Sequence, residues 1–143
     1  MGTRCLSAAL SVAAALAAPA LASPTQDYML YCMGCHGAEA QGVPGKIPAL
    51  AANLARFMRT PEGRNYVLRV PGAANSALPD ARLAAVLNWL SEQYPAPHEA
   101  APAAFTVAEV AAVRRAPLAN VQQARRAVVG ALEATGSAPP ASY

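Results

Sequence analysis

The feature that most constrains this chain is a Cys-x-x-Cys-His pattern in the stretch YCMGCHG, residues 31–37. The chain of 143 residues holds three cysteines and two histidines, and this stretch contains two of the cysteines and one histidine. Two thiols three positions apart, with an imidazole directly after them, fit on about one helical turn. In a chain so poor in these residues, such a cluster indicates a site with its own chemistry.

The first 22 residues have the pattern of a signal peptide. A positively charged start is followed by an apolar run at 6–18 and by a small-x-small pattern at 20–22. We predict cleavage after Ala22, which would remove Cys5 and leave an exported, periplasmic chain beginning at Ser23. The alternative is an uncleaved anchor helix, but the apolar run is shorter than the about 20 residues of a membrane span. We therefore expect no integral membrane span after cleavage.

The mature chain would keep only Cys32 and Cys35, at the spacing that suits covalent attachment of haem. Haem carries two vinyl groups, and two thiols on one helical turn can each form a thioether to one of them. The imidazole of His36 can then bind the iron from the same side. We predict one covalently attached haem c, with Cys32 and Cys35 as the thioether residues and His36 as the proximal axial ligand.

Three other uses of the cysteine pair are weighed against haem. A thioredoxin-like site places its Cys-x-x-Cys after a strand of a βαβ unit, and no sheet is predicted here. A structural zinc site needs four ligands, whereas His98 is the only other histidine and no further cysteine remains. A disulfide between Cys32 and Cys35 is the default in an oxidising compartment, but it leaves His36 without a role.

The mature part of the chain shows helical periodicity without paired strands, which predicts an all-α fold. After a flexible lead at 23–27, one helix is expected at 26–36 and another at 51–59. The stretch NYVLRV, residues 65–70, is interpreted as a short helix or an extended segment. The prolines and glycines of QGVPGKIPAL, residues 41–50, indicate a loop.

The clearest helix follows the predicted loop PGAANSALP. Asp80 can cap or charge its start, and Pro95 ends it. Trp89 lies beside an apolar stripe with helical offsets. The stripe consists of Leu83, Val86, Leu87, Leu90 and Tyr94.

An alanine- and proline-rich linker at 96–104 leads to a predicted helical extension at 105–136. Gly136 ends the second of its two helices, and residues 137–143 are a predicted disordered tail. Each helix begins with a capping-box pattern, Thr106 with Glu109 and Asn120 with Gln123. Apolar residues on both helices predict that the extension folds back over the core, while a basic strip leaves docking to a partner open. That strip consists of Arg114, Arg115, Arg125 and Arg126.

Together these features resemble the class I c-type cytochromes over residues 24–94. The resemblance rests on the export signal, the early CMGCH, the glycine- and proline-rich loop and the helix LPDARLAAVLNWLSEQY. It implies a cytochrome c domain at 23–95, with a helical fold around covalently attached haem. In that family the last core helix packs across the first, so Trp89 and Tyr94 are expected in that contact.

The resemblance also implies a sixth iron ligand, usually a methionine in the loop before the last core helix. Here that loop, Val70 to Asp80, contains neither methionine nor histidine. Met29 and Met33 belong to the proximal side, so Met58 is the candidate distal axial ligand, with core packing as its alternative role. His98, in the linker, is a more distant candidate. If no side chain binds, the iron is five-coordinate and open to a small gas or peroxide.

The function that the resemblance implies is periplasmic electron transfer rather than enzymatic catalysis, with weak peroxidase activity left open. The protein would take single electrons from a dehydrogenase-type donor and pass them to an oxidase or another cytochrome. Two alternatives are a five-coordinate haem protein that binds a gas or peroxide and an accessory haem subunit of a dehydrogenase. A formal charge of +3 without a Lys/Arg run argues against nucleic acid as a partner. Arg56, Arg59 and Arg64 are expected near a haem propionate.

Overall fold

The computed structural model describes residues 22–116, 118–137 and 139, so most of the predicted signal peptide and tail lies outside the described residues. The described part of the chain forms eight helices and no β-sheet, which confirms the predicted all-α, cytochrome c-like fold. Its one extended pairing is an isolated bridge between Val43 and Ile47. Among the helices of this part, none has the length and apolar character needed to cross a membrane.

Helix α1 (Pro24–Tyr31) begins at a complete capping box. The side chain of Ser23 accepts a hydrogen bond from the N–H of Gln26, whose side chain accepts one from the N–H of Ser23. Asp27, in the first turn, is buried and pairs with Arg82 of the later helix α6. The predicted flexible lead is therefore wrong, because its residues form the capped and anchored first turn of α1.

Helix α2 (Met33–His36) follows after a break at Cys32, whose φ of −126° and ψ of −41° depart from helical values. The prediction of one unbroken helix at 26–36 is thus wrong at a single residue. No proline or glycine marks this break in the sequence. Gly37 ends α2 with a φ of 78°, which glycine adopts without steric cost.

Helices α3 (Asn53–Phe57) and α4 (Pro61–Arg69) are joined by a short connection in which Thr60 caps α4. The ring of Phe57 stacks on that of Tyr66, with centroids 5.4 Å apart. Of the two readings of NYVLRV, the helical one is correct, because the stretch continues a helix that Pro61 and Thr60 begin.

A further short helix, α5 (Pro71–Ala74), lies within the stretch predicted as a loop. Pro71 occupies its first turn, where the fixed φ of proline is already helical. The loop prediction is therefore wrong for these four residues and holds for the segment after them.

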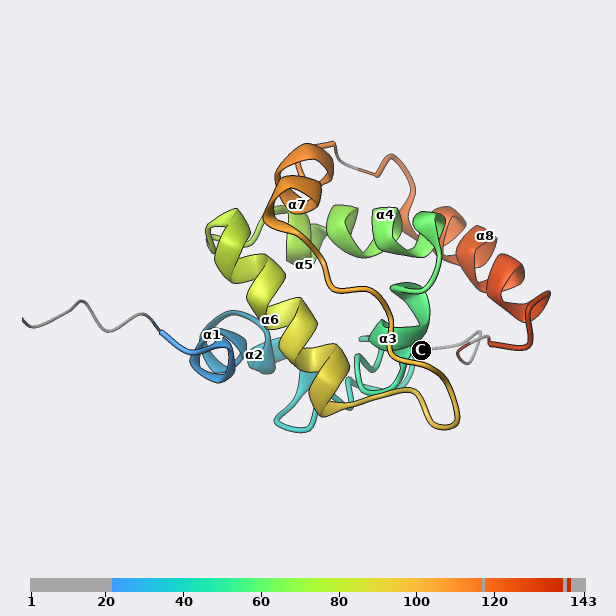
Figure 1. Cartoon of the computed structure of the whole chain (residues 1–143), viewed down its shortest axis with the longest axis horizontal. Coiled ribbons are helices and arrows are strands. Elements are labelled where there is room, and N and C mark those ends of the chain that lie inside the picture. The colour runs from blue at the N-terminus through green and yellow to red at the C-terminus, as the bar shows by residue number, and fades with distance from the viewer. Residues whose placement is uncertain (1–21, 117, 138, 140–143) are drawn as a thin grey trace, which may run out of the picture.

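Helix α6 (Asp80–Gln93) is the central element, and the four residues of its predicted stripe that lie within the helix are buried in the core, whereas Tyr94, at its C-cap, is half-buried. Trp89 contacts Tyr28 of α1, with ring centroids 5.7 Å apart, which confirms the expected crossing of the first and last core helices. Asp80 does not cap the helix; it occupies the first turn and pairs with Arg114. In Figure 1, α6 runs diagonally across the molecule with α1 and α2 beside it.

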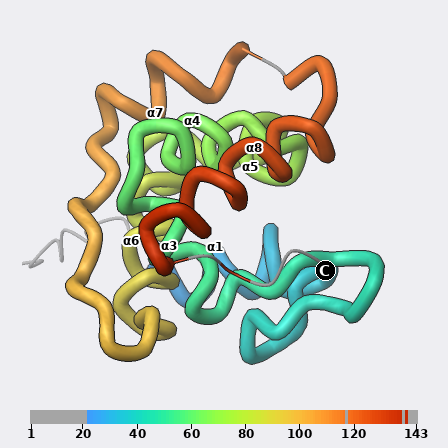
Figure 2. The backbone as a smooth tube through the Cα atoms, turned by 90° about the vertical axis from the view of Figure 1, so that its right-hand side faces the viewer, coloured from blue at the N-terminus to red at the C-terminus, as the bar shows by residue number. Residues whose placement is uncertain are grey.

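The extension folds back over this core. Helix α7 (Val107–Val113) packs on α6 and α4, and helix α8 (Val121–Glu133) packs on α4 and α3. Figure 1 shows the linker running up to α7, and Figure 2 shows α8 lying along α4. The extension adds five side chains to the common core: Phe105, Val110, Val128, Val129 and Leu132.

Both helices of the extension start at the predicted caps. The side chains of Thr106 and Asn120 accept hydrogen bonds from the N–H groups of Glu109 and Gln123. The carboxylate of Glu109 does not complete a capping box, because it binds Arg64 of α4 instead. Gly136, which has a φ of 73°, lies just after the end of α8, as predicted.

Candidate functional site

Cys35 and His36 of the Cys-x-x-Cys-His pattern lie on the single turn of α2, and Cys32 directly precedes it. The N–H groups of Cys35 and His36 both donate to the carbonyl of Cys32, at 3.2 and 3.0 Å. Cys32 is half-buried and Cys35 is exposed, and both thiols are free. The turn therefore presents two available sulfurs and one imidazole side by side.

The imidazole of His36 is held by the carbonyl oxygen of Pro48, which lies 3.0 Å from Nδ1. A carbonyl oxygen only accepts, so Nδ1 carries the proton and Nε2 keeps its lone pair. No described residue hydrogen-bonds to Nε2. A histidine whose Nδ1–H is fixed by a backbone carbonyl and whose Nε2 is unpaired has the arrangement of a metal ligand.

The environment of His36 also favours the form that can bind a metal. Burial lowers the pKa of the imidazole, and the hydrogen bond to Pro48 opposes this shift without cancelling it. The neutral form therefore extends to lower pH than in water. Neutral imidazole is the form that ligates metal ions.

The loop between the turn and Pro48 is shaped to return the chain to His36. The N–H of Gly42 donates to the carbonyl of His36 at 2.8 Å, and Val43 and Ile47 pair across a tight turn. Gly42 has a φ of 68°, and a Cβ there would lie 2.3 Å from the carbonyl oxygen of Ile47. Glycine is required at this position, and the closed loop places the Pro48 carbonyl at the imidazole.

The pair of Cys32 and Cys35 does not have the character of a redox-active dithiol, as the pKa of the Cys32 thiol indicates. Its pKa is raised by burial and then by the charges of Asp27 and Cys35. Thioredoxin-like sites instead lower the pKa of their attacking cysteine. Within the described residues, no group of three or more His, Cys, Asp and Glu side chains is arranged to hold a metal ion alone.

Met58, the candidate distal ligand, is a fully buried residue at the end of α3, with an exposed fraction of 1%. Its carbonyl accepts a hydrogen bond from Arg64. Its side chain belongs to the buried hydrophobic core. Its contacts give Met58 a packing role, and ligation of iron by Met58 stays a prediction. His98 is exposed in the linker, with a φ of 62°.

The arginines expected near a haem propionate are held by the linker and the extension instead. Nε of Arg56 lies 2.8 Å from a carboxylate oxygen of Glu99, and Nε of Arg59 lies 3.6 Å from the other. Arg64 forms a two-point ion pair with Glu109. Their partners lie 40 or more residues away in sequence, so no local pattern could have shown these pairs.

The predicted basic strip on the extension does not exist as one surface. Arg114 and Arg125 are buried, whereas Arg115 and Arg126 are exposed. The guanidinium of Arg125 lies 5.3 Å from the centre of the Phe57 ring, so it faces the core. The two buried arginines contact the rest of the protein, so only Arg115 and Arg126 of the predicted strip are exposed to solvent.

Sequence reasoning singled out Cys32, Cys35 and His36 but missed the residues that orient them. Pro48 acts through its backbone carbonyl, which no side-chain pattern reveals. Tyr28 belongs to no motif in the sequence, yet its hydroxyl donates a hydrogen bond to the carbonyl of Gly37, which directly follows α2.

The fold and the Cys–Cys–His turn define a chain similar to the c-type cytochromes, and a comparison with known proteins agrees with that class. Over 39 residues, the chain is 41% identical to two cytochrome c-552 proteins of Thermus thermophilus. The aligned stretch is 27% of this chain and covers 30% and 26% of those proteins. The chain thus spans less than a third of the relatives that it matches. No protein-family model matches it.

Proposed function

We propose that the protein is a periplasmic monohaem c-type cytochrome that carries single electrons. The observation that carries this proposal is the hydrogen bond from Nδ1 of His36 to the Pro48 carbonyl, which leaves Nε2 unpaired beside two free thiols. Cys32 and Cys35 would hold haem c through thioethers, and His36 would be its proximal ligand. When bound, the haem supplies an iron that changes between its ferric and ferrous states.

In this proposal the chain itself performs no bond chemistry on a substrate. Its residues would bind and orient the cofactor: Pro48 fixes the tautomer of His36, and burial lowers the pKa of the imidazole, which favours its neutral form. Hydrogen bonding around an axial ligand and burial of the site are the means by which proteins set the potential of a haem. The similarity to cytochrome c-552 supports the same role.

The partners proposed for the protein are a periplasmic dehydrogenase-type donor and an oxidase or another cytochrome as acceptor. Electron transfer between proteins needs a cofactor close to the surface, and the thiol of Cys35 is exposed. Met29, Leu30 and Tyr31, directly before the motif, are also exposed. A redox partner that docks there would come close to the haem. Secretion by a cleaved signal peptide remains part of the proposal.

A second candidate function is binding of a small gas or peroxide at an open iron site. The observation that favours it is the burial of Met58 in the hydrophobic core, together with a segment from Val70 to Asp80 that offers no methionine or histidine. The basic strip that left the accessory-subunit reading open is not one surface, because Arg114 and Arg125 are buried.

Visible spectra of the haem-loaded protein, oxidised and reduced, with and without carbon monoxide, test the two candidates. A carrier with Met58 as ligand gives a spectrum that carbon monoxide does not change, and Met58→Ala makes it responsive. The control Met29→Ala changes an exposed methionine and leaves the spectrum as in the wild type. A wild-type spectrum that shifts readily with carbon monoxide supports the second candidate. Absence of any haem absorbance contradicts both.

A further inference from the structure

Tyr28 is a buried aromatic residue that connects the central helix to the haem-binding turn. It lies on α1 with an exposed fraction of 2%, and its ring packs against Trp89 of α6 at a centroid distance of 5.7 Å. This contact fixes the ring between two helices that contact each other closely. The position of its hydroxyl is therefore set by the core and not by the turn.

The hydroxyl of Tyr28 donates a hydrogen bond to the carbonyl oxygen of Gly37, with an oxygen–oxygen distance of 2.5 Å. Gly37 directly follows His36 and ends α2. A buried phenol needs a partner, and the carbonyl can only accept, so the proton lies on Tyr28. Burial accordingly raises the pKa of Tyr28 to about 12, and the phenol stays a donor over the whole neutral range.

The turn that bears His36 is thus held at three points. Pro48 accepts from its ring, Gly42 donates to its backbone carbonyl, and Tyr28 holds the carbonyl of the next residue. The first two of these contacts come from the same loop, which the chain forms after the turn. Tyr28 supplies the contact that ties the turn to the helical core.

We propose that Tyr28 is a positioning residue for the axial ligand: its hydroxyl anchors Gly37 and so keeps the His36 imidazole on the Pro48 carbonyl. This inference rests on the proposed function, in which His36 binds the haem iron. Without the hydroxyl, the Gly37 carbonyl keeps only the N–H of Ala40, at 3.2 Å, and loses its contact with the core, so the turn and its imidazole gain freedom together. Loss of one intramolecular hydrogen bond is enough to change an opening equilibrium about tenfold.

Exchange of the His36 Nδ1 proton with solvent, followed by NMR in the reduced, haem-loaded protein, tests this inference. Tyr28→Phe keeps the ring against Trp89 and removes only the hydroxyl. We expect the proton to exchange about tenfold faster, because exchange requires the His36–Pro48 bond to open. Tyr94→Phe is the matched control: its hydroxyl makes an exposed contact with Glu39 at 3.3 Å, and its loss should leave the exchange rate unchanged.

An unchanged exchange rate in Tyr28→Phe overturns the inference, even if the thermal midpoint falls, because Tyr28 would then only stabilise the fold. Equal acceleration in both variants also overturns it, since that indicates general loosening. The proposed function fails separately, if the wild-type chain holds no haem. The same exchange measurement on that haem-free chain still tests the role of Tyr28.

Discussion

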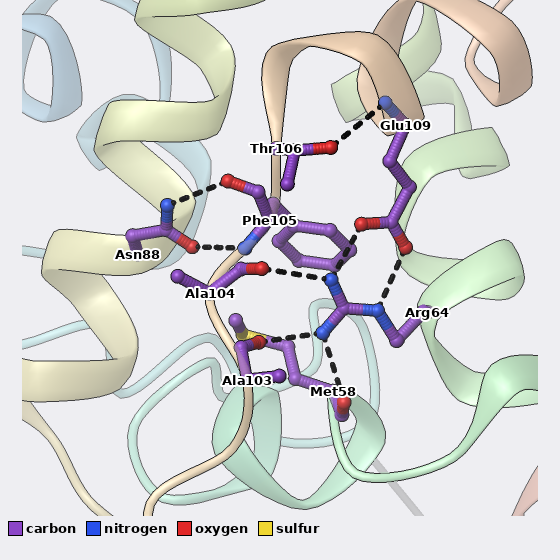
Figure 3. A network of polar contacts seen from close by, with 8 residues as sticks. All are labelled: Met58, Arg64, Asn88, Ala103, Ala104, Phe105, Thr106 and Glu109. Atoms are coloured by element: carbon purple, nitrogen blue, oxygen red, sulfur yellow. Dashed lines mark hydrogen bonds and ion pairs between the residues drawn. The ribbon is translucent and has the colours of Figure 1, made fainter.

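The guanidinium of Arg64 and the carboxylate of Glu109 form a two-point ion pair, with Nε–Oε1 and Nη2–Oε2 distances of 2.7 and 2.5 Å. The same guanidinium donates to backbone carbonyls of the linker and lies 4.2 Å from the centre of the Phe105 ring (Figure 3). The pair joins α4 of the core to α7 of the extension. The extension is therefore fastened to the core by specific polar contacts as well as by apolar burial.

Glu109→Gln should lower the free energy of unfolding by about 1–2 kcal/mol at neutral pH, because it removes the charge from a partly exposed ion pair. The hydrogen bond from Arg64 lowers the pKa of Glu109. A carboxyl whose pKa is lower in the folded than in the unfolded state stabilises the folded protein. Its contribution is complete above the pKa of the unfolded state, about 4.3 for Glu, and is lost as the pH falls through the pKa of the folded state. Denaturant unfolding at several pH values should show the variant's deficit shrinking in acid. Equal unfolding of Glu109→Gln and of the exposed control Glu133→Gln at neutral pH would contradict this.

Arg114→Ala should be much more costly than Arg115→Ala. Arg114 is buried, donates to the carbonyls of Leu78 and Ser76 at 2.9 and 2.7 Å and lies 3.1 Å from Asp80. Its loss leaves polar groups without partners and should cost about 2–3 kcal/mol. The side chain of Arg115 is 78% exposed and 3.6 Å from the same carboxylate, so its removal should cost under about 0.5 kcal/mol. Similar midpoints for the two variants in denaturant would rule out this assignment.

Replacing Arg82 should destabilise the protein more than replacing Asp27 by asparagine. The two side chains form a close ion pair between α6 and α1, in which the carboxylate is 1% exposed and the guanidinium 36% exposed. Arg82→Ala leaves a buried charge without its partner, which costs about 3–5 kcal/mol. Asp27→Asn leaves an arginine that water can reach, and should cost about 1–2 kcal/mol. The reverse order of the two unfolding free energies would show that the carboxylate is solvated.

Truncation after Pro97 should prevent stable folding. Five side chains of the extension are buried in the common core, at about 1.5–3 kcal/mol each. Together they match the about 5–15 kcal/mol net stability of a typical domain. Circular dichroism during heating should show a lost or strongly lowered transition. An unchanged midpoint, with only electron transfer to a donor impaired, would mean instead that the extension serves docking.

The elements that could be predicted from sequence are those with local signals. The stripe of α6 and the caps at Thr106 and Asn120 are each written within a few residues. The Cys–Cys–His turn is equally local. The break at Cys32 carries no signal of its own and could not be predicted.

The features that could not be predicted depend on residues far apart in the chain. Arg64 meets Glu109 across 45 positions, and Asp27 meets Arg82 across 55. The sequence does not show which residue an arginine or aspartate contacts. A haem propionate is therefore expected near Arg56, Arg59 and Arg64, whereas the structure pairs them with Glu99 and Glu109. The carbonyl of Pro48 is invisible to any pattern of side chains, although it orients the candidate ligand.

The intact mass of the protein, purified from the periplasm of a cell that attaches haem to exported chains, tests whether Cys32 and Cys35 hold a haem. We predict the mass of residues 23–143 plus one haem, which acid extraction does not remove. The double variant Cys32→Ala, Cys35→Ala should carry no covalent haem. A wild-type mass without haem, two hydrogens lighter because Cys32 and Cys35 have formed a disulfide, would contradict the account.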